Sequence, residues 1–233
     1  MRSRGPAAGE PRRHLAPHLS PHRLRLIVIT DPGLAAPRAV EEVAAQALEG
    51  GAPSIQLRDK DQGGGELLPL ARRLRELTRR FGALFFVNDR LDLALAVGAD
   101  GIHLGPTDLP VSAVRSVVPV EFLIGFSADD PDAARAAVAE GADYLGCGTV
   151  WPTASKGDPG EVIGIEGLQR VVAAVEAPVV AIGGITPERA ALLPPTGTAG
   201  AAVIGAVMSV PDPAEAVRVL LAQLDPNQTH NDP

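Results

Sequence analysis

The sequence is poor in the residues on which several common kinds of site depend. Its 233 residues include a single Cys, which excludes a disulfide framework and a zinc site built from cysteines. Aromatic residues make up 3%, too few for the stacking platforms that bind single-stranded nucleic acid. No apolar run reaches the roughly 18 residues that a membrane span needs. No apolar secretory segment is present either, so we expect a cytoplasmic protein with no membrane partner.

Net charge is unevenly distributed along the chain. The net charge is −7, although the first 25 residues contain six Arg and one Glu. An acidic body argues against nucleic acid as the main partner, but it leaves room for a local basic pocket that binds a small anion. The 45% of apolar residues is enough for the full core of a soluble globular protein.

Lysine, asparagine and histidine are rare in the body of the chain. There are 19 Arg but only two Lys, Lys60 and Lys156. Asn88 is the only Asn, and His103 the only His, outside the two terminal segments. Where nearly all basic residues are Arg, random placement explains the two exceptions poorly. The two ammonium groups are therefore candidates for a specific role.

Short apolar segments alternate with amphipathic ones along most of the chain. The predicted strands are 25–30, 54–57, 84–87, 101–104, 122–125, 144–147, 179–182 and 202–204. The predicted helices are 38–50, 65–80, 91–98, 110–118, 131–140, 165–176, 187–193 and 213–224. Each strand is short and apolar almost throughout, as strands buried on both faces are. Eight such units in about 200 residues predict a single (β/α)8 TIM barrel. The alternative, a doubly wound open sheet, normally has fewer strands or a clear switch point.

The two ends of the chain differ from this alternating body. Residues 1–23 are rich in Arg, Pro and Ala and have no apolar period, which predicts a disordered N-terminal extension. Residues 225–233 form a short polar C-terminal tail. The TIM-barrel catalytic domain is therefore expected to span residues 24–224.

Basic and amide side chains follow the second predicted strand. Alternation along an extended chain places Gln56, Arg58 and Lys60 on one side. An amide, a guanidinium and an ammonium on one face form an anion site. Taken alone, this segment is more typical of a solvated charged turn.

Two carboxylates follow the third and fourth predicted strands. Asn88 and Asp89 come directly after the third strand, and Asp108 comes shortly after the fourth. One or two carboxylates, completed by water and substrate phosphates, are what Mg²⁺ prefers. The alternative is that Asp89 and Asp108 cap the helices that follow, which would explain Asp108 well but Asn88 poorly.

Hydroxyl groups and glycines follow the later strands. Ser127 comes after the fifth strand, and the long segment after the sixth holds Thr153, Ser155 and Lys156. Glycines follow the seventh and eighth strands at Gly184 and Gly205. Hydroxyls, an ammonium and glycines at these strand ends favour a phosphate site, although glycines also simply end strands. Together these residues indicate a functional site, because chance would scatter them over both ends of a barrel.

These motifs closely resemble those of the thiamine phosphate synthase family. The matching segments are Gln56-Leu57-Arg58-Asp59-Lys60, Asn88-Asp89-Arg90, and residues 101–108, 151–156 and 181–185. The resemblance runs from about Leu24 to Leu224. It implies that the chain joins 4-amino-2-methyl-5-(diphosphooxymethyl)pyrimidine to a thiazole phosphate, which is 4-methyl-5-(2-phosphoethyl)thiazole or its carboxylated form. The products would be thiamine phosphate and diphosphate, in a substitution where the pyrimidine carbon ionises first.

The resemblance also implies a role for each matching residue. The residues expected to hold the pyrimidine diphosphate are Gln56, Leu57, Arg58, Asp59, Lys60 and Asn88. Mg²⁺ would be bound by Asp89 and Asp108. The residues expected to hold the thiazole phosphate are Thr153, Ala154, Ser155, Gly184, Ile204 and Gly205. Those expected to act on the pyrimidine or its leaving diphosphate are Arg58, Lys60, Ser127 and Lys156. Positive charge at the departing group, in a dry pocket, suits an ionisation.

The chain departs from the family pattern at four positions. Asp129 stands where a His is usual, Thr149 where a Pro is usual, Ser155 where a Thr is common, and Gly205 where a Ser is usual. Two alternative functions remain: a thiazole tautomerase of the same fold, and a non-catalytic barrel that binds a phosphate ligand. Tautomerases typically lack the Gln-x-Arg-x-Lys and Asn-Asp motifs, and a pure binder has no need of a metal pair. Association into a homodimer is left open.

Three further residues are interpreted as structural. Cys147 lies within the sixth strand and is expected to be a small buried hydrophobe. His103 lies in the middle of the fourth strand and is treated as structural. Trp151 is expected to wedge the start of the segment after the sixth strand, although it could also line the pocket.

Overall fold

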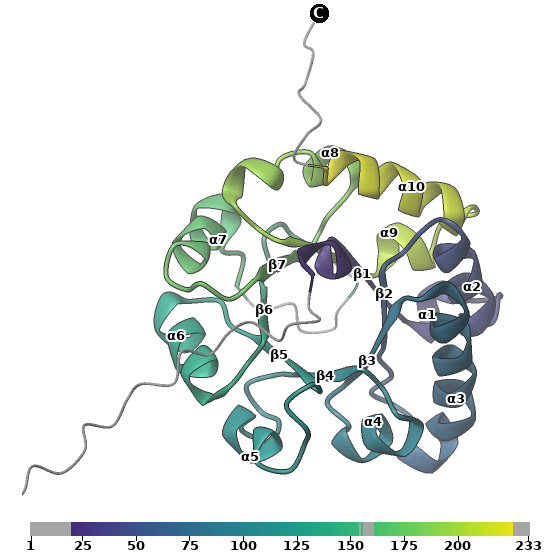
Figure 1. Ribbon diagram of the computed structural model, residues 1–233. Coiled ribbons are helices and arrows are strands. Elements are labelled where there is room, and N and C mark those ends of the chain that lie inside the picture. Colours follow the sequence, from purple (N-terminus) through teal and green to yellow (C-terminus); the bar gives the residue numbers. More distant parts are fainter. Residues whose placement is uncertain (1–19, 154, 156–160, 226–233) are drawn as a thin grey trace, which may run out of the picture.

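The eight strands close into one parallel barrel in chain order, with β1 paired to both β2 and β8. The computed structural model describes residues 20–153, 155 and 161–225. Helices surround the strands on the outside (Figure 1). The strands are β1 (Leu26–Ile29), β2 (Ser54–Leu57), β3 (Leu84–Asn88), β4 (Gly101–Leu104), β5 (Leu123–Ser127), β6 (Tyr144–Cys147), β7 (Val179–Ile182) and β8 (Gly200–Val203). The predicted TIM barrel is confirmed.

The helices follow the predicted order, with two short additions. The main helices are α2 (Val40–Glu49), α3 (Gly64–Phe81), α4 (Leu91–Val97), α5 (Val111–Arg115), α6 (Pro131–Glu140), α7 (Gly164–Val172), α8 (Pro187–Ala190) and α10 (Pro213–Gln223). The helices α1 (Pro32–Ala35) and α9 (Gly205–Met208) were not predicted, because four residues are too few to show a helical period. A 3₁₀ turn, η2 (Pro194–Thr196), precedes β8. No helix in the described part of the chain is both long and apolar enough to cross a membrane.

Four helices begin with the same local device. The residue before each accepts a hydrogen bond from a backbone N–H of the first turn, and a Pro follows it directly. These capping residues are Asp31, Asp130, Thr186 and Asp212, before α1, α6, α8 and α10. A capping oxygen followed by Pro, whose missing N–H is not needed there, starts a helix at a defined residue. The strands thus lead into their helices through short, well-defined turns.

Four strands differ from their predicted bounds: β1 and β3 differ only by single residues at their ends, and β5 and β8 differ by more. β5 continues to Ser127, and β8 begins at Gly200 and ends before Ile204. Gly200 is tightly enclosed, because an added Cβ would overlap the carbonyl oxygens of Leu24 and Arg25. Small residues such as Gly200 carry little strand propensity, so the sequence pattern missed the start of β8. The extension of β5 places Ser127 on the barrel wall.

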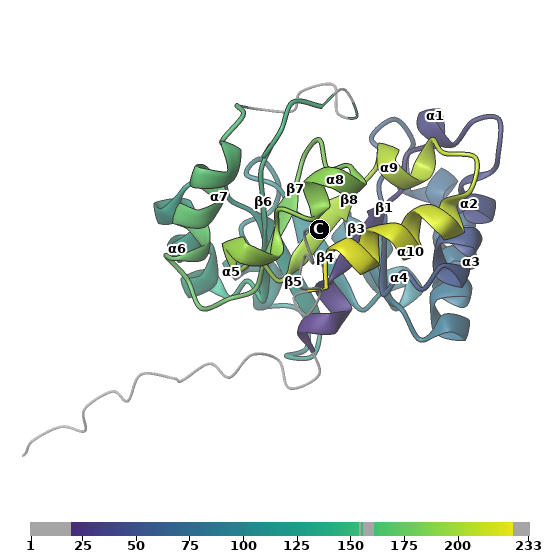
Figure 2. The ribbon, with the colours of Figure 1, turned by 90° about the horizontal axis from the view of Figure 1, so that it is seen from above.

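The amino end of the barrel is closed by the 3₁₀ helix η1 (Pro21–Leu24). Figure 2 shows η1 at one end of the barrel, opposite the end that carries α1 and α9. Leu24 is completely buried, and the Ser54 hydroxyl donates to the carbonyl oxygen of Arg23 at 2.5 Å. Residues 21–23, assigned to the extension from their composition, therefore belong to the barrel. Residues 1–19 and 226–233, which hold most of the predicted extension and tail, lie outside the described residues.

Aromatic side chains fill the interior of the barrel beneath its carboxyl end. Tyr144 and Phe86 are fully buried, with ring centroids 5.4 Å apart. Gly125, the neighbour of Tyr144 in the register, leaves space for the Tyr ring, since an added Cβ would overlap it. The packed layer gives the barrel a closed floor, and the space above it faces the carboxyl ends of the strands.

Candidate active site

A cavity of about 530 Å³ lies at the carboxyl ends of the strands. It brings together predicted residues from four different strand ends. These are Gln56, Arg58, Lys60, Asn88, Asp89, Asp108 and Ser127. The register explains the convergence, because Gln56, Asn88 and Ser127 occupy inward-facing positions of β2, β3 and β5. The structure therefore joins motifs that are separated by up to 71 residues in the chain.

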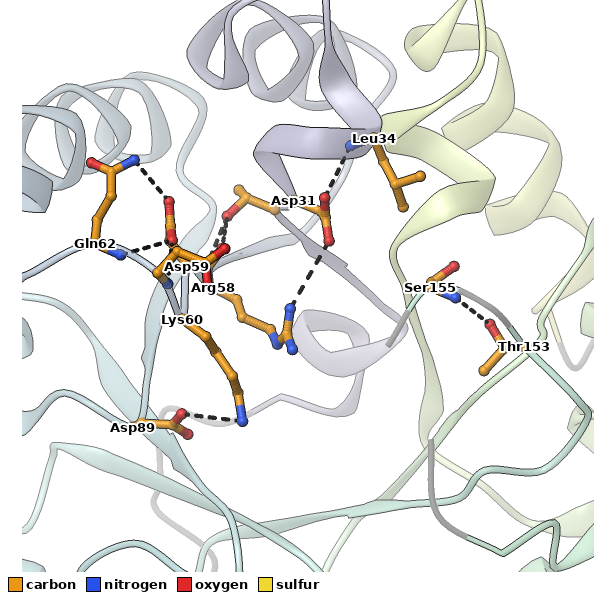
Figure 3. Close-up of polar contacts among 11 residues, drawn as sticks. Asp31, Leu34, Arg58, Asp59, Lys60, Gln62, Asp89, Thr153 and Ser155 are labelled. Carbon is orange, nitrogen blue, oxygen red and sulfur yellow. Dashed lines mark hydrogen bonds and ion pairs between the residues drawn. The ribbon is translucent and has the colours of Figure 1, made fainter. Parts of the chain in front are cut away.

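Arg58 is held in place by groups from the end of β1. Its Nη1 lies 4.0 Å from Asp31 Oδ2, and its side chain is 17% exposed (Figure 3). Its backbone N–H donates to Thr30 Oγ1 at 2.9 Å, and the Thr30 hydroxyl donates back to its carbonyl oxygen at 3.2 Å. Asp31 also caps α1 by accepting from the backbone N–H of Leu34. Asp31 and Thr30 therefore support the site, and the sequence interpretation missed them because it assigned nothing to the first strand.

Two residues of the predicted motif at positions 56–60 do not face the large cavity. Leu57 is 2% exposed and, by alternation, lies on the opposite side of β2 from Gln56. Asp59 accepts hydrogen bonds from the backbone N–H groups of Asp61 and Gln62 and from the Gln62 amide (Figure 3). Neither side chain lines the large cavity. Asp59 shapes the turn after β2 that brings Lys60 to the cavity.

Asp89 and Asp108 both line the cavity, and Asp108 is close enough to shift the pKa of Asp89. Burial, and after it the neighbouring carboxyl group of Asp108, together raise the pKa of Asp89 to about 6. Lys60, whose Nζ is 3.9 Å from Asp89 Oδ2, and Arg58 oppose the increase (Figure 3). Two carboxylates this close repel unless a proton or a cation lies between them. The pair is therefore a favourable place for a positive ion.

The helix-capping interpretation of these two acids is wrong. The residue before α4 is Arg90 and the residue before α5 is Pro110, and neither helix is capped by a side chain. Asp108 instead accepts from the backbone N–H of Gly105 at 2.6 Å, within its own loop. Asp89 adopts a left-handed backbone conformation, with φ of 63°, which is uncommon for a residue other than glycine. Such a conformation at a cleft indicates that the direction of the Asp89 side chain matters.

The donor set of the pair fits Mg²⁺. The described ranges contain no group of three or more His, Cys, Asp and Glu side chains suited to a metal ion. Two carboxylates with open coordination positions suit an ion that keeps water and substrate oxygens as its other ligands.

Asp129, the residue that replaces the usual His, also lines the cavity and accepts from the backbone N–H of Gly148 at 2.9 Å.

His103 belongs to the cavity, contrary to its interpretation as a purely structural residue. It lies beside Asn88 in the register, with Nε2 3.0 Å from the Ser127 hydroxyl and Nδ1 3.1 Å from the Tyr144 hydroxyl. The sequence carried a signal for this position. Because Gly101 and His103 alternate with the apolar Ile102 and Leu104, the period of two places His103 either inward or outward, and the register decides for inward.

A second, smaller cavity of about 50 Å³ adjoins the first and shares Ile182 and Ala202 with it. Its lining includes the predicted phosphate residues of the later strand ends, Thr153, Ser155, Gly184, Ile204 and Gly205. The Thr153 hydroxyl oxygen accepts from the backbone N–H of Ser155 at 3.2 Å (Figure 3). The other two predicted residues of this segment, Ala154 and Lys156, lie outside the described residues.

Gly184 is required by its position. Its φ is 64°, and an added Cβ would lie 2.6 Å from the carbonyl oxygens of Trp151 and Pro152. Only glycine adopts this conformation in this space without strain. The backbone at Gly184 therefore packs closely against the backbone at Trp151 and Pro152, and this contact forms part of the wall of the small cavity.

Trp151 and Cys147 lie outside both cavities. Arg189 lies 5.6 Å from the centroid of the Trp151 ring and donates to the carbonyl oxygen of Gly184 at 2.6 Å. Trp151 therefore fixes the start of the loop after β6, as expected, and is not among the lining residues. Cys147 is completely buried, and burial raises the pKa of its thiol to about 12. Its interpretation as a buried hydrophobe is confirmed.

Comparisons with known proteins agree on one family. The family described as thiamine monophosphate synthase matches residues 26–207. The chain is 49% identical over 195 residues to a thiamine-phosphate synthase of Moorella thermoacetica, which covers 84% of this chain and 93% of that protein. It is 48% identical over 192 residues to that of Pyrococcus horikoshii, covering 82% and 89%. Among solved structures, thiamine phosphate pyrophosphorylase from Pyrococcus furiosus superposes with a TM-score of 0.80 at 44% identity, covering 88% of this chain and 96% of the other.

Proposed function

The chain belongs to the thiamine monophosphate synthase family and acts in thiamine biosynthesis as a thiamine-phosphate synthase, and we propose that it does so by joining the pyrimidine diphosphate to a thiazole phosphate with release of diphosphate. The observation that carries this proposal is the adjacency of two anion sites. The large cavity combines Arg58 and Lys60 with the carboxylate pair, and the small cavity is lined by hydroxyls and glycines. Two phosphorylated substrates that must react with each other need two such sites in contact.

Asp89 and Asp108 are the residues that would hold Mg²⁺. When bound there, the ion would neutralise charge on the diphosphate and so help it to leave. The hydrogen bond from Gly105 to Asp108 and the positive φ of Asp89 hold both carboxylates toward the same space. The chain therefore orients the pair through its own backbone.

The cationic side chains are proposed to stabilise the leaving group. Arg58, braced by Asp31, and Lys60, close to Asp89, place two positive charges at the carboxyl ends of β1 to β3. Charge already aimed at the developing anion needs no reorganisation during the reaction. Gln56, which is 3% exposed, and Asn88 offer amide groups that suit the pyrimidine ring.

Apolar residues complete the large cavity. Its wall includes Ile27, Ile29 and Val180 between the polar side chains. An ionised pyrimidine would react with water if water had access, so an apolar wall favours capture by the thiazole nitrogen. The cavity thus binds the charge of the diphosphate on one side and excludes water on the other.

The decisive experiment uses the full chain with both purified substrates. Thiamine phosphate and diphosphate in equal amounts, formed only with Mg²⁺ present, are the expected result. Isomerisation of the carboxylated thiazole phosphate without the pyrimidine substrate would instead indicate a tautomerase. Binding of the thiazole phosphate with no product of either kind would indicate a phosphate-binding barrel. Either of the last two results would overturn the proposal.

Gly205→Ser is expected to tighten binding of the thiazole phosphate about threefold to fivefold, the effect of one added hydrogen bond. The small cavity has room for the side chain, since an added Cβ would lie 3.1 Å from the flexible Ser155 hydroxyl and otherwise no nearer than 3.9 Å. Titration calorimetry with the thiazole phosphate measures the change. Gly205→Ala is the matched control, which adds the Cβ without the hydroxyl and is expected to bind no more tightly than the unmodified protein.

Lys156→Arg is expected to lower kcat about tenfold, although it keeps the charge. A compact ammonium approaches a single phosphate oxygen, whereas the planar guanidinium needs a wider site. Lys156 lies outside the described residues, so this prediction comes from the sequence alone. Steady-state turnover measures it, and a kcat equal to that of the unmodified protein would show that Lys156 is a solvated loop charge.

The cytoplasmic location and the homodimer also stay predictions.

A further inference from the structure

Three polar side chains from neighbouring strands form a hydrogen-bonded chain that leads from the buried core to the large cavity. Tyr144 of β6, 1% exposed, is at the more buried end, His103 of β4 is in the middle, and Ser127 of β5 is at the other end; all three residues belong to the lining of the cavity. Glycines make room for it. Gly125 accommodates the Tyr144 ring, and an added Cβ on Gly146 would lie 3.0 Å from His103 Cε1. The arrangement therefore depends on the shape of the barrel interior and not on mobile surface groups.

The direction of the first hydrogen bond follows from burial. Tyr144 is 1% exposed, and burial raises the pKa of its hydroxyl above its ordinary value, so the O–H keeps its proton. Among the described residues, His103 Nδ1 is the one hydrogen-bond partner of this hydroxyl, at 3.1 Å. A buried O–H with no acceptor is unfavourable, so Tyr144 must donate to Nδ1.

The direction of the second hydrogen bond follows from the first. When Nδ1 of a neutral imidazole is an acceptor, Nε2 carries the proton. Nε2–H then donates to the Ser127 oxygen at 3.0 Å. The Ser127 hydroxyl proton is consequently not used within the chain of hydrogen bonds and is available to the cavity that Ser127 lines.

The opposite arrangement is less favourable for a specific reason. If Nδ1 carried the proton, it would donate to the Tyr144 oxygen and leave the buried Tyr144 O–H without a side-chain or backbone acceptor in the described part of the chain. Ser127 would then donate to Nε2, and its proton would point away from the cavity. The single hydroxyl of Tyr144 therefore decides which way the Ser127 proton faces.

We propose that Tyr144 is a positioning residue that acts through His103 to direct the Ser127 hydroxyl proton into the cavity, where it donates to an oxygen of the anionic substrate group. The identification of that group as the diphosphate rests on the proposed function. The orientation of the proton does not, because it follows from the protein's own hydrogen bonds.

Nitrogen-15 NMR of the histidine-labelled full chain tests the orientation without substrate. The signals of His103, assigned by their loss in His103→Gln, are expected to show a neutral imidazole protonated at Nε2. Tyr144→Phe keeps the ring and removes the hydroxyl, so a second population protonated at Nδ1 is expected to appear. A His103 that is protonated at Nδ1 in the unmodified protein would overturn the proposal, as would a tautomer that Tyr144→Phe leaves unchanged.

A double-mutant cycle on turnover tests the connection to Ser127. Tyr144→Phe is expected to lower kcat about threefold to tenfold, the effect of one oriented hydrogen bond, with little change in KM. With Ser127→Ala already present, the same change should lower kcat less than about twofold, because the proton to be oriented is gone. Equal effects in both backgrounds would show that the hydroxyl contributes only to packing.

Phe86→Leu is the packing control. It alters the packing against the Tyr144 ring, whose centroid lies 5.4 Å from that of Phe86. It leaves the three hydrogen-bonding side chains, Tyr144, His103 and Ser127, in place. It is expected to leave the His103 tautomer unchanged and to have the same effect on kcat with and without Ser127. If the unmodified protein formed no thiamine phosphate at all, the proposed function would be contradicted. The NMR result would then decide the role of Tyr144 by itself.

Discussion

Asp89→Asn and Asp108→Asn are each expected to lower kcat at least about 1000-fold at moderate Mg²⁺ concentration, because a metal ion at the leaving group contributes several kcal/mol to the transition state. Asn is the appropriate replacement at both positions. At position 89 it tolerates the left-handed backbone better than Ala does. At position 108 its carbonyl oxygen still accepts from the backbone N–H of Gly105. The change therefore removes one negative charge and little else.

Turnover as a function of Mg²⁺ concentration measures this effect. Asp92→Asn is the matched control, because Asp92 is a nearby acid whose side chain is exposed and paired with Arg90 instead of facing the cavity. The control should turn over within about twofold of the unmodified protein. Thermal unfolding of all three variants should be nearly unchanged. A normal rate for Asp89→Asn or Asp108→Asn at limiting Mg²⁺ would contradict the metal assignment.

Arg58→Gln is expected to lower kcat at least about 100-fold, the usual effect of removing one preorganised donor from a transition state. The Arg58 side chain is largely shielded from water, so its charge is screened less than a surface charge would be. Asp31 keeps its hydrogen bond from the backbone N–H of Leu34 when the guanidinium is gone. The 4.0 Å ion pair is too long to contribute more than about 1 kcal/mol to stability, so the variant should remain folded.

Arg90→Gln provides the comparison for Arg58→Gln. Arg90 follows the neighbouring strand end but pairs with Asp92, at 2.6 Å, on the outside of the site. Pre-steady-state formation of diphosphate should be slowed in Arg58→Gln and unaffected in Arg90→Gln, while both bind the thiazole phosphate normally. If Arg58→Gln weakened thiazole phosphate binding instead of slowing diphosphate formation, Arg58 would belong to the other anion site.

The barrel fold and the location of the site at the carboxyl ends of its strands follow from the sequence by itself. The repeated alternation of short apolar strands with amphipathic helices predicted the barrel, since strands buried on both faces leave a pattern that local sequence shows directly. The polar residues that interrupt this pattern fall at strand ends, and a parallel barrel brings all strand ends to one face. Chain topology alone therefore placed Arg58, Asn88 and Asp108 in one region.

Only the tertiary structure decided which side chains face the cavity and what supports them. Asp59 belongs to the predicted motif but folds back on Gln62, because its turn closes through local hydrogen bonds. Asp108 fits the pattern of a helix cap, yet its partner is Gly105 within its own loop. His103 reads as one polar residue in an apolar strand, and its role depends on Ser127 and Tyr144, which are 24 and 41 residues away. Residue order determines the strands and where they end, but the direction of each side chain depends on register and loop geometry, which come from contacts between distant segments.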